Sequence, residues 1–353
     1  MEYTVYRDRK IYLDVLRIIA IFFVVFNHTG TRGFFLFSVT ENPYTYWVYL
    51  FLSILCKVAV PLFFMVSGSL ILSKNESISL LYYKRVLKYT MVLIIFSLYW
   101  YISSISWDYT KFSLSEFLTK IYSINIIVPY WFLYSYLAAL IMLPFIRRMA
   151  QGMSKKEFVY LLILQVMFSG ILPAIQYLFF DDKYKIFISL QIVTTTSIFF
   201  MLMGYFFENK LIINQSNKKK ITFIIVLFGA ISLLIACGLT HLKAVKTGEF
   251  SESFYNSFIA LPTIAIFYIT KEIVNRFKAN KSLQKVIISI SECTFGIYLF
   301  EEYFRNKLNF IYEALLPYLH CMLSSYIYIF CVIICGYILT VVLKRIPYIN
   351  KLF

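Results

Sequence analysis

The chain is dominated by a succession of apolar stretches, each about as long as a lipid bilayer is thick. A membrane-spanning helix needs about 20 predominantly apolar residues, because it rises 1.5 Å per residue through a hydrocarbon core about 30 Å thick. Ten stretches meet this requirement, at roughly 11–30, 46–73, 86–107, 126–146, 157–180, 186–208, 221–241, 253–275, 286–304 and 321–343. The sequence therefore predicts an all-α, polytopic membrane protein with about ten transmembrane helices.

The composition excludes a soluble enzyme. Hydrophobic residues make up 60% of the chain and charged residues 15%, whereas soluble domains carry about 25% charged residues. No apolar stretch is separated from the next by a connection long enough for a soluble domain. We therefore expect residues 1–353 to form a single transmembrane domain. The sequence does not indicate an oligomeric state.

The net charge of +16 does not indicate nucleic-acid binding, because of where the cations lie. If the N-terminus is cytoplasmic, 23 Lys and Arg residues fall in inside segments and nine in outside segments, with Arg17 and Lys57 within spans. Such a bias sets the orientation of membrane proteins, and basic inside loops also attract anionic lipid headgroups. We expect both termini in the cytoplasm, contact with membrane lipid and no nucleic-acid partner.

The first apolar stretch carries ionisable residues on one face. Arg17 and His28 are eleven residues apart, which places them about 20° from the same direction and about 16 Å apart along a helix, with Asp14 nearby. Charged groups in a span are costly and therefore functional candidates, and a neutral histidine is a good general base. The alternative is an Asp14–Arg17 ion pair at headgroup level with His28 as a solvated residue at the helix end.

Two further groups are candidates. Arg85 and Lys88 are three residues apart at the start of the third span, with Lys84 beside them, a pattern that can hold phosphates but also fits ordinary inside cations. Near the outer end of the ninth span lie Glu301 and Glu302. One of these carboxylates can orient and polarise His28, or both can extend to the membrane interface.

Other residues carry less weight. The second stretch contains Pro61 and Gly68, so an interruption of the helix there is plausible. His241 and His320 are expected at outer helix ends. The six cysteines form no CxxC pair, and three scattered histidines predict no metal site.

Taken together and in order, several segments resemble the acyltransferase-3 family of integral membrane acyltransferases. The interval from Arg17 to His28 is similar to an Arg-x10-His signature of that family, and "KRVLK" resembles its Arg-x-x-Arg motif, with Lys88 in place of the second arginine. Four further blocks resemble family motifs: "VPLFFMVSGSLIL" with Ser67 and Gly68, "WFLYSYLAALIMLPFIR" from Trp131, "FFMLMGYFF" with Gly204, and "FGIYLF" with Gly296 and Tyr298. The pattern is most similar to surface-polysaccharide O-acetyltransferases such as the one acting on enterobacterial common antigen.

The resemblance implies transfer of an acyl group, expected to be acetyl, from acyl-CoA to a hydroxyl of a bacterial surface glycan or lipid-linked sugar. Acetyl-CoA would be a co-substrate, with no bound cofactor, and the protein would lie in the bacterial plasma membrane. His28 would be a general base or a transient acyl acceptor, supported by Asp14, Arg17 and Glu301. The cations at 84, 85 and 88 would bind the CoA phosphates.

Two departures from the family pattern concern the mechanism. Many members have histidine where this chain has Glu301, and also two positions before the fourth-span tryptophan, where this chain has Pro129.

Two functions are alternatives to acyl transfer. One is a transporter or flippase for a lipid-linked sugar, which the interrupted second span would suit. The other is a glycosyltransferase with a polyprenyl donor, which would prefer more acidic residues in the first outer loop.

Overall fold

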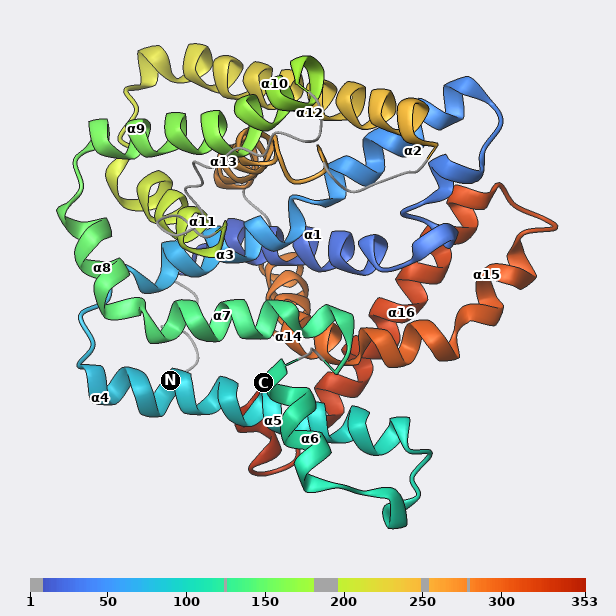
Figure 1. The fold of residues 1–353 in the computed structure, drawn as a ribbon. Helices are drawn as coiled ribbons and strands as arrows, with labels where there is room; N and C mark the ends of the chain where they lie inside the picture. The colour runs from blue at the N-terminus through green and yellow to red at the C-terminus, as the bar shows by residue number, and fades with distance from the viewer. Residues whose placement is uncertain (1–8, 124–125, 181–195, 249–253, 278–279) are drawn as a thin grey trace.

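The structure, a computed structural model, describes residues 9–123, 126–180, 196–248, 254–277 and 280–353 (Figure 1). Over these ranges the regular structure is entirely helical, which confirms the predicted fold class. The α-helices are α1 Ile11–Asn27, α2 Pro43–Cys56, α3 Ala59–Ile71, α4 Ile78–Leu81, α5 Leu87–Ser104, α6 Leu114–Ser123, α7 Trp131–Ile141, α8 Leu143–Gly152, α9 Lys155–Val166, α10 Leu172–Phe179, α11 Thr196–Tyr205, α12 Gln215–Thr247, α13 Ala260–Arg276, α14 Lys281–Lys307, α15 Asn309–Leu315 and α16 Cys321–Leu343.

Six helical segments of the described chain are long and apolar enough to cross a membrane, and α6 with residues 128–141 makes a seventh if that bent pair is one span. The six are 43–71, 78–104, 155–179, 215–247, 281–307 and 321–343. The protein is therefore a polytopic membrane protein. The other predicted spans correspond to α1 and α13, which have 17 residues each, and to α11, before which residues 186–195 lie outside the described ranges. The count of ten and the cytoplasmic termini stay predictions.

The second span is interrupted, but not where its proline and glycine suggested. The break lies at Lys57 and Val58, between α2 and α3. Pro61 is the third residue of α3, where a missing N–H costs nothing because the first turn of a helix has no internal acceptors for its N–H groups. Gly68 lies inside α3 without breaking it.

Two other predicted spans are divided. The stretch 126–146 forms α7 and α8, which part at Met142, and Pro144 lies in the first turn of α8. The stretch 157–180 contains a π-helical turn at Met167–Ile171 between α9 and α10. The sequence did not indicate α6 and α15, since each is too short to give a 20-residue apolar run.

Helix α1 lies near the middle of the molecule and packs against α3, α13, α14 and α16 (Figure 1). One of its neighbours, α3, crosses α11 at van der Waals contact of the two backbones. A Cβ at Gly68 would lie 1.9 Å from the carbonyl oxygen of Met201, and a Cβ at Gly204 would lie 1.9 Å from that of Met65. Ser69 closes the contact by donating to the Gly204 carbonyl at 2.9 Å. These two glycines therefore determine how closely the helices pack.

Candidate active site

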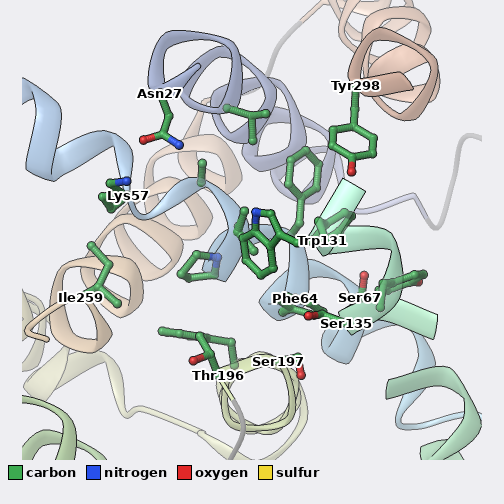
Figure 2. A pocket seen from close by; sticks show the side chains of 18 of the residues that line it. Asn27, Lys57, Phe64, Ser67, Trp131, Ser135, Thr196, Ser197, Ile259 and Tyr298 are labelled. Carbon is green, nitrogen blue, oxygen red and sulfur yellow. The ribbon is translucent and has the colours of Figure 1, made fainter. Parts of the chain in front are cut away.

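A cavity of about 1550 Å³ runs beside α1 and is bordered by segments of α3, α5, α7, α11 and α14. Six of the predicted site residues line it: Arg17, His28, Ser67, Lys88, Trp131 and Tyr298. Figure 2 shows Trp131 projecting toward its middle, with Asn27 and Lys57 on one side and Ser67 on the other. Because α1 rises 1.5 Å per residue, the Arg17 end and the His28 end of this cavity are about 16 Å apart.

At the His28 end, an imidazole meets a buried carboxylate. His28 is the residue that caps the C-terminus of α1, and its Nδ1 contacts Oε1 of Glu301 on α14. The Glu301 side chain is fully buried, whereas the His28 side chain is 17% exposed and borders the cavity. The contact joins residues 273 positions apart in the chain, so it exists only because α1 and α14 pack side by side.

The two adjacent glutamates have different surroundings. Glu301 faces His28, and Glu302 is partly exposed and pairs with Arg305. Arg305 also reaches the Glu301 carboxylate, with Nε 3.6 Å from Oε2, and donates to the backbone carbonyl of His28. Sequence reasoning placed Arg305 only among the outside cations. Its spacing of three and four residues from the two glutamates was the available signal.

At the Arg17 end, Asp14 is part of a buried polar cluster. It is not among the described residues that line the cavity. Arg9 donates to both Asp14 carboxylate oxygens at 2.9 Å, and the Ser291 hydroxyl donates to Oδ1 at 2.7 Å. Arg17 is farther from Asp14, at 3.4 Å, and borders the cavity. The expected stripe therefore divides: Arg17 and His28 share the cavity, while Asp14 ties α1 to α14. The expected Asp14–Arg17 pair is secondary to Arg9.

The three predicted phosphate-binding cations also separate. Lys88 lines the cavity and donates to the Phe353 carbonyl at 2.8 Å. Lys84 is exposed, and Arg85 donates to Glu76 at 2.9 Å. The shared face expected from their spacing assumed a regular α-helix, but residues 82–86 form a π-helical turn, whose wider winding rotates the preceding residues relative to α5.

Glu76 binds two arginines at this end of the molecule. Besides Arg85, it accepts a hydrogen bond at 2.7 Å from Arg147, a buried residue of α8 that also donates to the Ile71 carbonyl. The hydrogen bond from Arg85 is the main reason that the pKa of Glu76 is lowered to about 2, against the opposing effect of burial. The cluster fixes the loop between α3 and α4 against α8.

We expect Glu76→Gln to lower the melting temperature at pH 7 by a few degrees, because it leaves two arginines without their carboxylate. The pKa of Glu76 is lower than its usual 4.5, so the ion pairs stabilise the fold above pH 4.5 and are lost as the pH falls from 4.5 toward 2. The difference in melting temperature between wild type and Glu76→Gln should become smaller as the pH falls over that range. Thermal unfolding at several pH values measures this difference. Glu313→Gln, which breaks the exposed Arg32–Glu313 pair, is the control. A difference in melting temperature that does not change with pH would contradict this account.

The remaining motif residues divide into wall and framework. Ser67 and Trp131 border the cavity, as does Tyr298, whose hydroxyl donates to the Pro129 carbonyl at 2.7 Å. Gly68 and Gly204 serve the α3–α11 contact. Pro129, found where many family members have histidine, also lines the cavity, and the histidine among the described lining residues is His28.

The family profile described as an acyltransferase domain, that of the acyltransferase-3 family, matches residues 10–345, nearly the whole chain. The comparisons with curated proteins and with solved structures found no match to the chain. The match includes both ends of the cavity and every helix that borders it. The chain belongs to the acyltransferase-3 family and is a membrane acyltransferase, with an acyl donor and an acceptor as its substrates.

Proposed function

We propose that this acyltransferase moves an acetyl group from acetyl-CoA to a hydroxyl of a surface glycan or lipid-linked sugar in the plasma membrane of a bacterium. The observation that carries the proposal is that Arg17 and His28 border one cavity, and that His28 there meets the buried carboxylate of Glu301. A cation at one end suits an anionic donor, and an oriented imidazole at the other suits activation of a hydroxyl.

His28 supplies the base. When its Nδ1–H donates to Glu301, Nε2 is left with a lone pair that can accept the proton of the acceptor hydroxyl. The hydroxyl oxygen then attacks the thioester carbonyl, a C–O bond forms, and the C–S bond breaks. The proton held on Nε2 passes to the departing CoA sulfur, so His28 returns to its neutral form. Glu301 stabilises the imidazolium while it exists.

A two-step route through the same residue is the alternative. Nε2 of His28 would attack the thioester, CoA would leave, and the acceptor hydroxyl would then displace the imidazole from the acyl group. The single displacement needs only one transfer and is the route we favour. Rapid acid quench of protein mixed with labelled acetyl-CoA, without acceptor, distinguishes them, because only the two-step route leaves label on the chain.

The donor end rests on two cations. Arg17 and Lys88 line the same cavity as His28, with Arg17 about 16 Å from His28 along α1, and guanidinium and ammonium groups bind phosphate well. The other two cations are less well placed. Arg85 is bound by Glu76, and Lys84 is exposed on the surface. We therefore assign the phosphate-bearing part of acetyl-CoA to Arg17 and Lys88.

We expect Lys88→Met to raise the KM for acetyl-CoA about 10- to 100-fold, the effect of losing one hydrogen bond to a charged group. Lys84→Met is the matched control, because it removes the same charge from the same motif outside the cavity wall, and it should change KM less than about twofold. Initial rates at varied acetyl-CoA measure both. Equal effects of the two variants would show that the phosphates do not bind at the cavity.

The function itself is tested by incubating the purified protein with acetyl-CoA labelled in the acetyl group and with membrane glycolipids and glycans of the producing bacterium. The expected result is label released by mild alkali, as for an O-acetyl ester. Transport of a lipid-linked sugar without acetyl-CoA, and no labelled glycan, would instead support the transporter alternative.

A further inference from the structure

Arg305 is bound on several sides at the His28 end of the cavity. It contacts the carboxylates of Glu301 and Glu302 and donates to the backbone carbonyl of His28. Its own carbonyl accepts a hydrogen bond at 2.8 Å from the hydroxyl of Tyr328, a buried residue of α16. One side chain thus joins the end of α1 to α14, and its backbone is fixed to α16.

We propose that Arg305 is a positioning residue for the transfer reaction, acting through Glu301 on His28; this inference rests on the proposed function. Glu301 has no exposed surface, and an ionised carboxylate is costly to bury without a cation. The neutral imidazole of His28 does not supply that charge. Arg305, with Nε 3.6 Å from Glu301 Oε2, supplies it and keeps the carboxylate an acceptor for the Nδ1–H of His28.

The contact with the His28 carbonyl adds a second constraint. The last carbonyls of a helix have no partner within it, and α1 ends at Asn27. The guanidinium satisfies the His28 carbonyl, so the backbone that carries the imidazole is fixed to the same helix as Glu301. Arg305 therefore balances the charge of the Glu301 carboxylate and also fixes the direction in which His28 meets it. Arg305 itself is not among the described residues that line the cavity.

The test compares Arg305→Met, which removes the charge, with Arg305→Lys, which keeps it, in full-length protein in nanodiscs. We expect Arg305→Met to lower kcat about 10- to 100-fold with the KM for acetyl-CoA unchanged, and Arg305→Lys to recover at least part of the loss. Arg32→Met, which breaks the exposed Arg32–Glu313 pair near the same end, is the matched control and should change kcat less than twofold.

A second measurement reports on the imidazole directly. The chain contains three histidines, so ¹⁵N signals of His28 can be assigned by substituting the other two. In wild type we expect the tautomer with the proton on Nδ1, and in Arg305→Met a mixture of both tautomers, with Arg305→Lys close to wild type. If Arg305→Met fails to fold, Arg305→Gln, which keeps a hydrogen-bond donor without charge, takes its place in both measurements.

Unchanged kcat together with unchanged ¹⁵N signals in the neutral variant would overturn the proposal. A rise in the KM for acetyl-CoA at constant kcat would also overturn it, by assigning Arg305 to donor binding. Neither outcome affects the proposed function as long as His28→Ala is inactive. Conversely, an active His28→Ala variant would refute the proposed chemistry itself.

Discussion

His28→Ala is expected to lower acetyl transfer by about 10²- to 10⁴-fold, the usual contribution of a positioned general base. The residue borders the cavity, and Glu301 holds its Nδ1, so no other histidine of the described chain is placed to replace it. Binding of acetyl-CoA should persist, because Arg17, one of the two donor cations, lies about 16 Å away along α1. The measurements are the initial rate of labelled acetyl transfer and the dissociation constant of acetyl-CoA.

His241→Ala and His320→Ala are the matched controls. His241 pairs with the Tyr46 hydroxyl at 2.9 Å and His320 with the Tyr49 hydroxyl at 3.1 Å, and neither lines the cavity. Both variants should retain at least half of the wild-type rate. Substantial transfer by His28→Ala, or an equal loss in all three variants, would contradict the assignment of His28 as the base.

Gly68→Ala and Gly204→Ala are expected to destabilise the protein most among single methyl additions. In each case the new methyl would lie 1.9 Å from a backbone carbonyl oxygen of the facing helix, and neither helix can yield without separating α3 from α11. Overpacking of this kind costs about 1–3 kcal/mol and occasionally more, and we expect about 3 kcal/mol for each variant. Thermal unfolding in detergent or nanodiscs measures the loss.

Gly238→Ala, in α12, is the matched control. A Cβ there meets nothing within 4 Å, and alanine is favoured over glycine inside a helix by about 0.5–1 kcal/mol, so this variant should be at least as stable as wild type. The double variant Gly68→Ala/Gly204→Ala should cost less than the sum of the single losses, since one separation of the helices accommodates both methyls. Wild-type stability of either single variant would show that the two helices do not cross so closely.

Apolar run length predicted the class of fold well. The span 321–343 coincides with α16, and 286–304 lies within α14. Such runs are informative because every backbone polar group in a bilayer must be satisfied, and a helix satisfies them within its own segment. The breaks at Lys57–Val58 and Met142 were not foreseen, since neighbouring helices decide where a span bends.

The sequence alone determined the helical membrane architecture, the family resemblance and the shared face of Arg17 and His28, because these depend on local composition and on the fixed rotation per residue of one helix. It could not determine that Glu301 would meet His28, that Arg9 would bind Asp14 or that Glu76 would bind Arg85. The Glu301–His28 contact joins two separate spans. The Arg9–Asp14 and Glu76–Arg85 contacts each depend on a segment outside a helix folding back. Only the tertiary structure decided them, because periodicity says which face a residue occupies but not which helix, or which loop, packs against that face.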